Sequence, residues 1–85
     1  MGNDAWRDFF ERWPADRPRT GIVVTRFQET IPFTRFLVAE GLIALERDRP
    51  DSLGARKVFL SLSSIDAVKM TDTEDFEGVR KFGFC

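Results

Sequence analysis

The segment Ala55–Thr71, with the sequence ARKVFLSLSSIDAVKMT, limits the possible folds of this chain more than any other segment. From Lys57 to Leu62 an aliphatic side chain recurs at every second position, which is the period of a strand with one buried face. Ser63 and Ser64 then supply hydroxyl groups that favour a turn, and Ile65–Met70 resumes an extended run. Two strands that leave so tight a corner need a further sheet to pack against. The segment therefore predicts a small β domain with strongly bent strands.

One helix and three further strands are predicted before this segment. The predicted elements are an amphipathic helix over 3–13 that ends at Pro14, and strands over 21–27, 31–39 and 42–49. A helix is the alternative for 38–47, because Leu, Ala and Glu favour helices, but Gly41 in its middle favours a strand. Pro32 cannot donate a backbone hydrogen bond, so we expect it at the start of its strand or on a sheet edge.

These elements predict a mainly β fold, in which an N-terminal α-helix precedes a five-stranded, strongly bent antiparallel small open barrel. The helix occupies residues 1–14 and the barrel residues 15–71. A C-terminal tail at residues 72–85 is acidic at first and then aromatic.

The connector at 15–20 and the tail are interpreted as exposed segments. Arg17 and Arg19 in the connector could reach a phosphate, but arginines in a polar link are more often simply solvated. Phe76, Val79 and Phe82 could form one or two turns of helix, but Gly78 and Gly83 argue against a firm helix in the tail. We therefore expect a tail that is loosely ordered alone or held by a partner.

Four aromatic side chains of the predicted helix recur at the spacing of one helical face. So apolar a stripe on so short a helix is interpreted as the cover of an open face of the domain. The alternative is docking into a groove of a larger protein partner or onto a membrane surface. The candidates for partner docking, which include two aromatic residues of the tail, are Trp6, Phe9, Phe10, Trp13, Phe82 and Phe84.

The composition favours one small domain that gains stability from partners. A chain of 85 residues hides only about 60% of its unfolded surface, so partner subunits are a natural source of further stability. The 13 basic and 14 acidic side chains nearly balance, so nucleic acid would need a local basic patch. The single cysteine, Cys85, permits no internal disulfide, which favours a cytoplasmic setting. No apolar run has the length of a membrane span, and the N-terminus does not resemble a signal peptide.

The residue types of common catalytic chemistry are missing from the chain. It contains no His, which excludes Ser-His-Asp catalysis, Cys-His catalysis and histidine metal sites. Its glycines form no phosphate-binding loop. The acidic residues of 72–77 lack the spacing of a Ca²⁺ loop, so we interpret them as a solvated run. We therefore expect no enzyme activity, no cofactor, no metal and no small-molecule substrate.

Two runs of the sequence resemble the Sm-like family of Sm, LSm and Hfq proteins. The run IVVTRFQETIPFTRFLVAE, at 22–40, resembles the first Sm motif. The run GARKVFLSLSSIDAVKM, at 54–70, resembles the second motif, with Ile65 just after the corner. The resemblance extends from about Asp4 to Thr71 and implies a helix followed by a small five-stranded barrel.

The chain departs from this family at the positions that contact uridine. Thr34 stands where the family usually has Gly, and Glu40 can stand for the family's Asp but is followed by no Asn. The run Ser61–Ser64 replaces the Arg-Gly-Asp/Asn corner, and the Lys-His corner of Hfq is absent. The base-contacting set is therefore not carried over, and RNA would need other surfaces. The RNA-contact candidates are Arg35, Glu40, Arg56, Lys57, Ser63, Ser64 and Lys69.

The resemblance also implies assembly, because in Sm-like rings the fourth strand of one subunit pairs with the fifth strand of the next. Independently, Lys57–Leu62 is an apolar strand that would be prone to aggregation as an unpaired edge. A closed ring removes such edges. The alternative is a monomer whose edge is covered by the helix or the tail. The candidates for a homo-oligomer interface are Lys57, Val58, Phe59, Leu60, Ala67, Val68 and Met70.

Two functions follow as expectations. The first is a non-enzymatic, ring-forming scaffold or protein-interaction module of the Sm-like type. The alternative is an RNA-binding protein of this type that uses loops bearing Arg and Lys in place of the usual uridine pocket.

Overall fold

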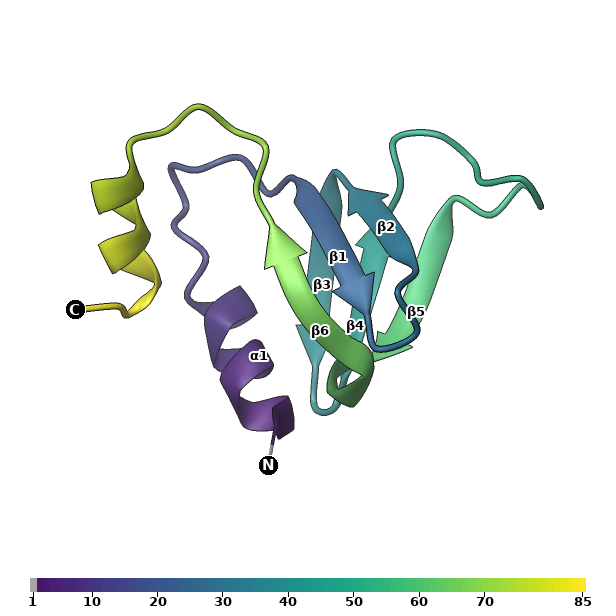
Figure 1. Cartoon of the computed structure of the whole chain (residues 1–85), viewed down its shortest axis with the longest axis horizontal. Helices are drawn as coiled ribbons and strands as arrows, with labels where there is room; N and C mark the ends of the chain where they lie inside the picture. The colour runs from purple at the N-terminus through teal and green to yellow at the C-terminus, as the bar shows by residue number, and fades with distance from the viewer. Residues whose placement is uncertain (1) are drawn as a thin grey trace.

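The computed structural model describes residues 2–85 as one helix followed by six strands and two short 3₁₀ helices (Figure 1). The elements are α1 (Gly2–Glu11), β1 (Gly21–Thr25), β2 (Thr30–Phe33), β3 (Arg35–Ala39), β4 (Leu42–Glu46), β5 (Lys57–Ser61), η1 (Leu62–Ser64), β6 (Ile65–Lys69) and η2 (Phe76–Phe82). The predicted helix and the strand-corner-strand arrangement of 57–70 are confirmed, and 42–46 forms a strand rather than the alternative helix.

The six strands form two three-stranded antiparallel sheets, with the strand orders β2-β1-β6 and β3-β4-β5. The chain passes from the first sheet to the second at Thr34, between β2 and β3. Pro32 lies in β2, an edge strand of its sheet, as expected from its missing N–H. Within residues 2–85 the two sheets do not close into a barrel, because β5 and β6 are not paired with each other.

The single strand predicted over 31–39 is wrong, since two strands lie there and the total is six rather than five. Ile31 and Phe33 are buried, but the next buried side chain is Phe36, so the alternation shifts by one residue. A bend at Thr34 produces this shift, and the Thr34 N–H donates to the Glu46 carbonyl at 2.8 Å. The bend allows both phenylalanines to face the same core from two different sheets.

The corner between β5 and β6 is closed by its own serines. Ser61 Oγ accepts from the Ser63 N–H at 3.3 Å, and Ser64 Oγ donates to the Ser61 carbonyl at 2.7 Å. Between them Leu62 points inward and is fully buried. The corner therefore anchors the two strands on the core.

Aromatic rings of α1, and that of Trp13 just after its end, close the open side of the two sheets. Phe10 and Trp13 are almost fully buried, and both rings lie 5.0 Å from the Phe36 ring. The interpretation of the helical stripe as core cover is confirmed for these two side chains, which are therefore not exposed for docking. Trp6 and Phe9 are only partly buried and pack at the margin of the core.

The tail is more ordered than we expected from its glycines. Phe82 is 4% exposed, and its ring stacks on Phe9 at 4.7 Å and meets Trp13 edge-on at 5.1 Å. These contacts hold η2 beside α1 (Figure 1). Phe82 therefore belongs to the core rather than to a docking surface, whereas Phe84 remains 57% exposed.

Arg17 was expected to be solvated, and this expectation is wrong. Its side chain is buried and forms an ion pair with Asp72, with 3.4 Å between Nη1 and Oδ2. Nη1 also lies 3.3 Å from Met70 Sδ, and the guanidinium sits over the Phe82 ring at 5.5 Å. The Arg17 side chain thus contacts both the segment just after β6 and the last residue of η2. Arg19, by contrast, is exposed and lies over the Phe36 ring at 4.8 Å.

The loop between β4 and β5 is organised by Asp51. Its carboxylate accepts hydrogen bonds from the N–H groups of Ala55 at 2.9 Å and Leu53 at 2.8 Å. These bonds, the one from Ala55 foremost, favour the ionised form and hold the pKa of Asp51 below its usual value.

Acid is expected to loosen this loop before it unfolds the domain. The pKa of Asp51 is lower in the folded loop than in the open one. Its contribution to the stability of the folded loop is therefore fully present above the ordinary aspartate pKa of about 3.9. That contribution is lost as the pH falls through the lowered value. We expect the amide resonances of Leu53 and Ala55 to shift together in this range in a pH titration. In an Asp51→Asn variant the two amides should not titrate, and the same pH-dependent shift in that variant would contradict the assignment.

Candidate interaction surface

The outer face of the β3-β4-β5 sheet carries a row of apolar side chains. Leu37, Ala44 and Phe59 are directly opposite one another on the three strands. Leu37 is 70% exposed and Phe59 is 73% exposed, although both are large and apolar. The neighbouring row towards η1 adds Leu42, which is 52% exposed. A contiguous apolar patch of this kind is a candidate contact surface.

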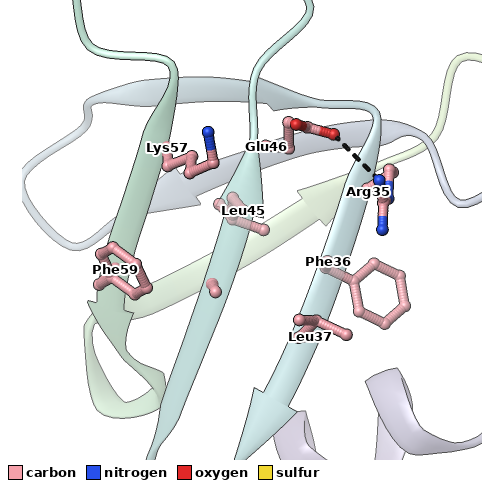
Figure 2. A pocket seen from close by; sticks show the side chains of 8 residues that line it. Arg35, Phe36, Leu37, Leu45, Glu46, Lys57 and Phe59 are labelled. Atoms are coloured by element: carbon pink, nitrogen blue, oxygen red, sulfur yellow. Dashed lines mark ion pairs between the residues drawn. The ribbon is translucent and has the colours of Figure 1, made fainter.

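A charged row borders the apolar row on its other side. Arg35, Glu46 and Lys57 are opposite one another in the register of the same strands. Arg35 Nη1 lies 3.7 Å from Glu46 Oε1, and Lys57 stands on the other side of this carboxylate (Figure 2). The face therefore presents apolar surface with a positive, negative, positive sequence of charges at its end.

The two rows enclose a shallow hollow of about 170 Å³ (Figure 2). Its lining residues are Arg35, Phe36, Leu37, Ala44, Leu45, Glu46, Lys57 and Phe59. Hydrocarbon forms most of this lining, and the charged groups lie at one end. The hollow is thus suited to an apolar side chain that is accompanied by charge.

The free side of β5 adds a backbone edge to this surface. The Arg47 N–H donates to the Arg56 carbonyl at 2.7 Å, and the Leu62 N–H donates to the Gly41 carbonyl at 2.9 Å. Bonded positions alternate in an antiparallel pair, so even-numbered residues of β5 face β4. The N–H and C=O groups of Lys57, Phe59 and Ser61 therefore point away from β4.

The predicted interface residues occupy the two outer strands of the fold. Lys57 and Phe59 are exposed on β5, whereas Val58 and Leu60 of the same strand turn inward and are partly buried against the core. On β6 and just beyond it, three candidates are partly buried, and these are Ala67, Val68 and Met70. The structure thus places the two groups on separate strands, each of which is an outer strand of its sheet.

The RNA-contact candidates are not brought together into one basic site. Arg35, Arg56 and Lys57 lie at one end of the β3-β4-β5 sheet, where Glu46 offsets part of their charge. Lys69 lies in the other sheet. These four cations therefore do not line one groove.

The remaining RNA candidates lie at the opposite end of the same sheet. Glu40 follows β3, and its neighbour Gly41 accepts the bond from Leu62 described above, which brings this turn beside Ser63 and Ser64. The serine hydroxyls bond within the corner, and Glu40 is an anion. This end of the sheet is therefore poorly suited to a phosphate backbone, and RNA binding stays a prediction.

Leu37 and Leu42 are surface residues that the sequence reasoning missed. The signal was present, because Leu37 stands between the apolar residues Phe36 and Val38, and a strand that buries these two directs Leu37 outward. An apolar residue at an outward position is the sequence sign of a contact surface.

No group of three His, Cys, Asp or Glu side chains is arranged to hold a metal ion in the part of the chain that the structure describes. None of the helices within residues 2–85 has the length and apolar character needed to cross a membrane. Comparison of the chain with protein-family models, with curated proteins and with solved structures found no match.

Proposed function

We propose that the chain is a non-enzymatic self-association module, an open small barrel of the Sm-like type, in which β5 of one copy pairs with β6 of the next. The observation that carries the proposal is the place of these strands, since each is an outer strand of its sheet. Because β2 continues into β3, the strand order runs β6-β1-β2 and then β3-β4-β5, and within residues 2–85 no further strand pairs with β6 or β5 at its two ends. Head-to-tail pairing occupies both edges, and a closed ring leaves no edge open.

The exposure of β5 supports this proposal over a monomer with a covered edge. The two segments available as cover are α1, which packs on η1 and β3, and η2, which packs on α1 through Phe9 and Phe82. Both lie on the side of the domain away from β5 (Figure 1). Phe59 on β5 and Leu37 on the same face of this sheet remain largely exposed, so burial against a second copy would remove apolar surface from water.

The direction of the proposed pairing follows from the sheets themselves. Every strand pair in the domain is antiparallel. Antiparallel ladders have the better hydrogen-bond geometry, so we expect β5 and β6 of neighbouring copies to run in opposite directions. Lys57 at the start of β5 then lies near Lys69 at the end of the neighbouring β6.

The wild-type chain is expected to elute as an assembly several times larger than its 9.8 kDa monomer. Light scattering on a sizing column, over a range of micromolar concentrations, measures this directly. A chain that stays monomeric over the whole range would refute the proposal.

A proline at Phe59 is expected to weaken the assembly by about tenfold or more. The N–H of Phe59 points away from β4, so Phe59→Pro removes an intermolecular donor and leaves the ladder to β4 intact. Phe59→Thr is the matched control, because it removes the aromatic ring and keeps the N–H. Weakening by proline well beyond that by threonine supports backbone pairing, whereas equal effects would assign the contact to the side chain alone.

A further inference from the structure

The hollow on the β3-β4-β5 face has a specific chemical preference. Its floor and wall are apolar, and two cations, Arg35 and Lys57, stand at one end with Glu46 between them. The complementary occupant is an apolar side chain of moderate size with carboxylates beside it in the sequence. Such an occupant gains from burial of hydrocarbon and from charge attraction at the rim.

The tail of this chain contains such a sequence. In the run DTEDFE, at 72–77, an aromatic residue stands between acidic neighbours. Phe76 is 79% exposed, in contrast to Phe82, which is buried six residues later. Glu74, Asp75 and Glu77 are also exposed. The domain therefore presents an apolar side chain that its own core does not use, and acids accompany it.

The tail cannot fill the hollow of its own molecule. The stack of Phe82 on Phe9 holds η2 beside α1. The β3-β4-β5 sheet ends at β5, on the far side of the domain from η2 (Figure 1). The occupant with matching chemistry is therefore the tail of a second copy.

We propose that Phe76 of one copy enters the hollow of the next copy, with Glu74 and Asp75 facing Arg35 and Lys57. The inference rests on the proposed head-to-tail pairing of β5 with β6. In that antiparallel pairing the end of β6, from which the tail departs, lies at the start of β5. The start of β5 is the end of the sheet that carries the cations.

The tail has the length that this contact needs. Asp72 is held to Arg17 within its own domain, so the reach is measured from there. The four residues from Asp72 to Phe76 span up to about 13 Å when extended. In the proposed pairing β6 lies one strand spacing from β5 of the next copy, so Ala44 on β4, which lines the hollow, is two spacings or about 10 Å away. Phe76 can therefore reach Ala44 without unpairing Asp72.

The proposal is tested by measuring the assembly constant of tail and hollow variants by light scattering. Phe76→Ser is expected to weaken the assembly by about tenfold or more, as loss of an aromatic anchor does. Phe84→Ser is the matched control, because Phe84 is an exposed aromatic residue of the same tail, and we expect it to change little. All the substituted side chains are exposed, so the fold should persist, which circular dichroism checks.

Charge reversal tests the partners of the tail. Reversing the tail with Glu74→Lys and Asp75→Lys, or the hollow with Arg35→Glu and Lys57→Glu, should weaken the assembly severalfold at low salt and less at high salt. A chain that carries both reversals should recover most of the wild-type constant, because the paired charges are exchanged.

Three outcomes separate this inference from the proposed function. A monomeric wild-type chain would overturn both. A wild-type assembly that Phe59→Pro dissociates, but that Phe76→Ser and the reversals leave unchanged, would overturn the tail contact and retain the strand pairing. Weakening by each reversal with recovery in the combined chain supports the tail contact.

Discussion

Replacing Phe10 by alanine is expected to lower the free energy of unfolding by about 3–5 kcal/mol, the usual cost of deleting a buried aromatic ring. Phe10 is 1% exposed, and its ring contacts Trp13, Phe33 and Phe36 at centroid distances of 6.0, 6.4 and 5.0 Å. Removal leaves a cavity between α1 and both sheets that rigid neighbouring rings cannot fill. Urea unfolding followed by tryptophan fluorescence measures the loss.

The same substitution at Phe27 is the control for Phe10. Phe27 is 85% exposed in the β1–β2 turn, so Phe27→Ala should change the free energy of unfolding by less than about 0.5 kcal/mol. All samples are compared at one protein concentration, because self-association couples stability to concentration. If the two variants lost equal stability, α1 would not be part of the core, and its stripe would again be a candidate docking element.

The elements that local periodicity specifies were predictable from the sequence. The i, i+3, i+4, i+7 aromatic spacing identified the helix, and alternation in Lys57–Ser61 identified β5 with its inward and outward sides. In both cases the signal lies within one element and reflects a single buried face. Such signals do not depend on where the rest of the chain goes.

The bend at Thr34 and the order of the tail could not be predicted in the same way. Each depends on a contact that forms only in the folded domain. Thr34 bends where its N–H meets the Glu46 carbonyl on β4, and the tail is held by the stack of Phe82 on Phe9. Propensity disfavoured a firm helix around Gly78, yet Phe76–Phe82 forms the 3₁₀ helix η2, whose order comes from tertiary packing.

The candidate surface was predictable in part. The sequence indicated Lys57 and Phe59 as edge residues, and their exposure on the outer strand agrees with this interpretation. The hollow was not predictable, because it depends on the register that sets Leu37 and Ala44 opposite Phe59. Register is a relation among three strands, and no single segment encodes it.

The second large effect is expected at Arg17. Arg17→Ala should lower the free energy of unfolding by about 3 kcal/mol, towards the lower end of what breaking a buried ion pair costs. The two side chains are only 5% and 14% exposed, so the substitution leaves the Asp72 carboxylate mostly buried without its cation. Urea unfolding gives the total loss in the free energy of unfolding. Amide hydrogen exchange should show that protection falls first in η2, because the Arg17 guanidinium lies over the Phe82 ring at the end of this helix.

Arg19→Ala is the control in the same connector, since Arg19 is exposed and its guanidinium lies over the face of the Phe36 ring. An exposed cation–π contact of this kind is worth about 0.5–1 kcal/mol. Adding Asp72→Asn to Arg17→Ala should recover part of the stability, because the carboxylate that Arg17→Ala leaves buried without a cation is then replaced by a neutral amide. Equal losses at Arg17 and Arg19, or no recovery in the double variant, would mean that the ion pair does not hold the tail. In that case the packing of the buried Phe82 ring would be sufficient to hold the tail without the ion pair.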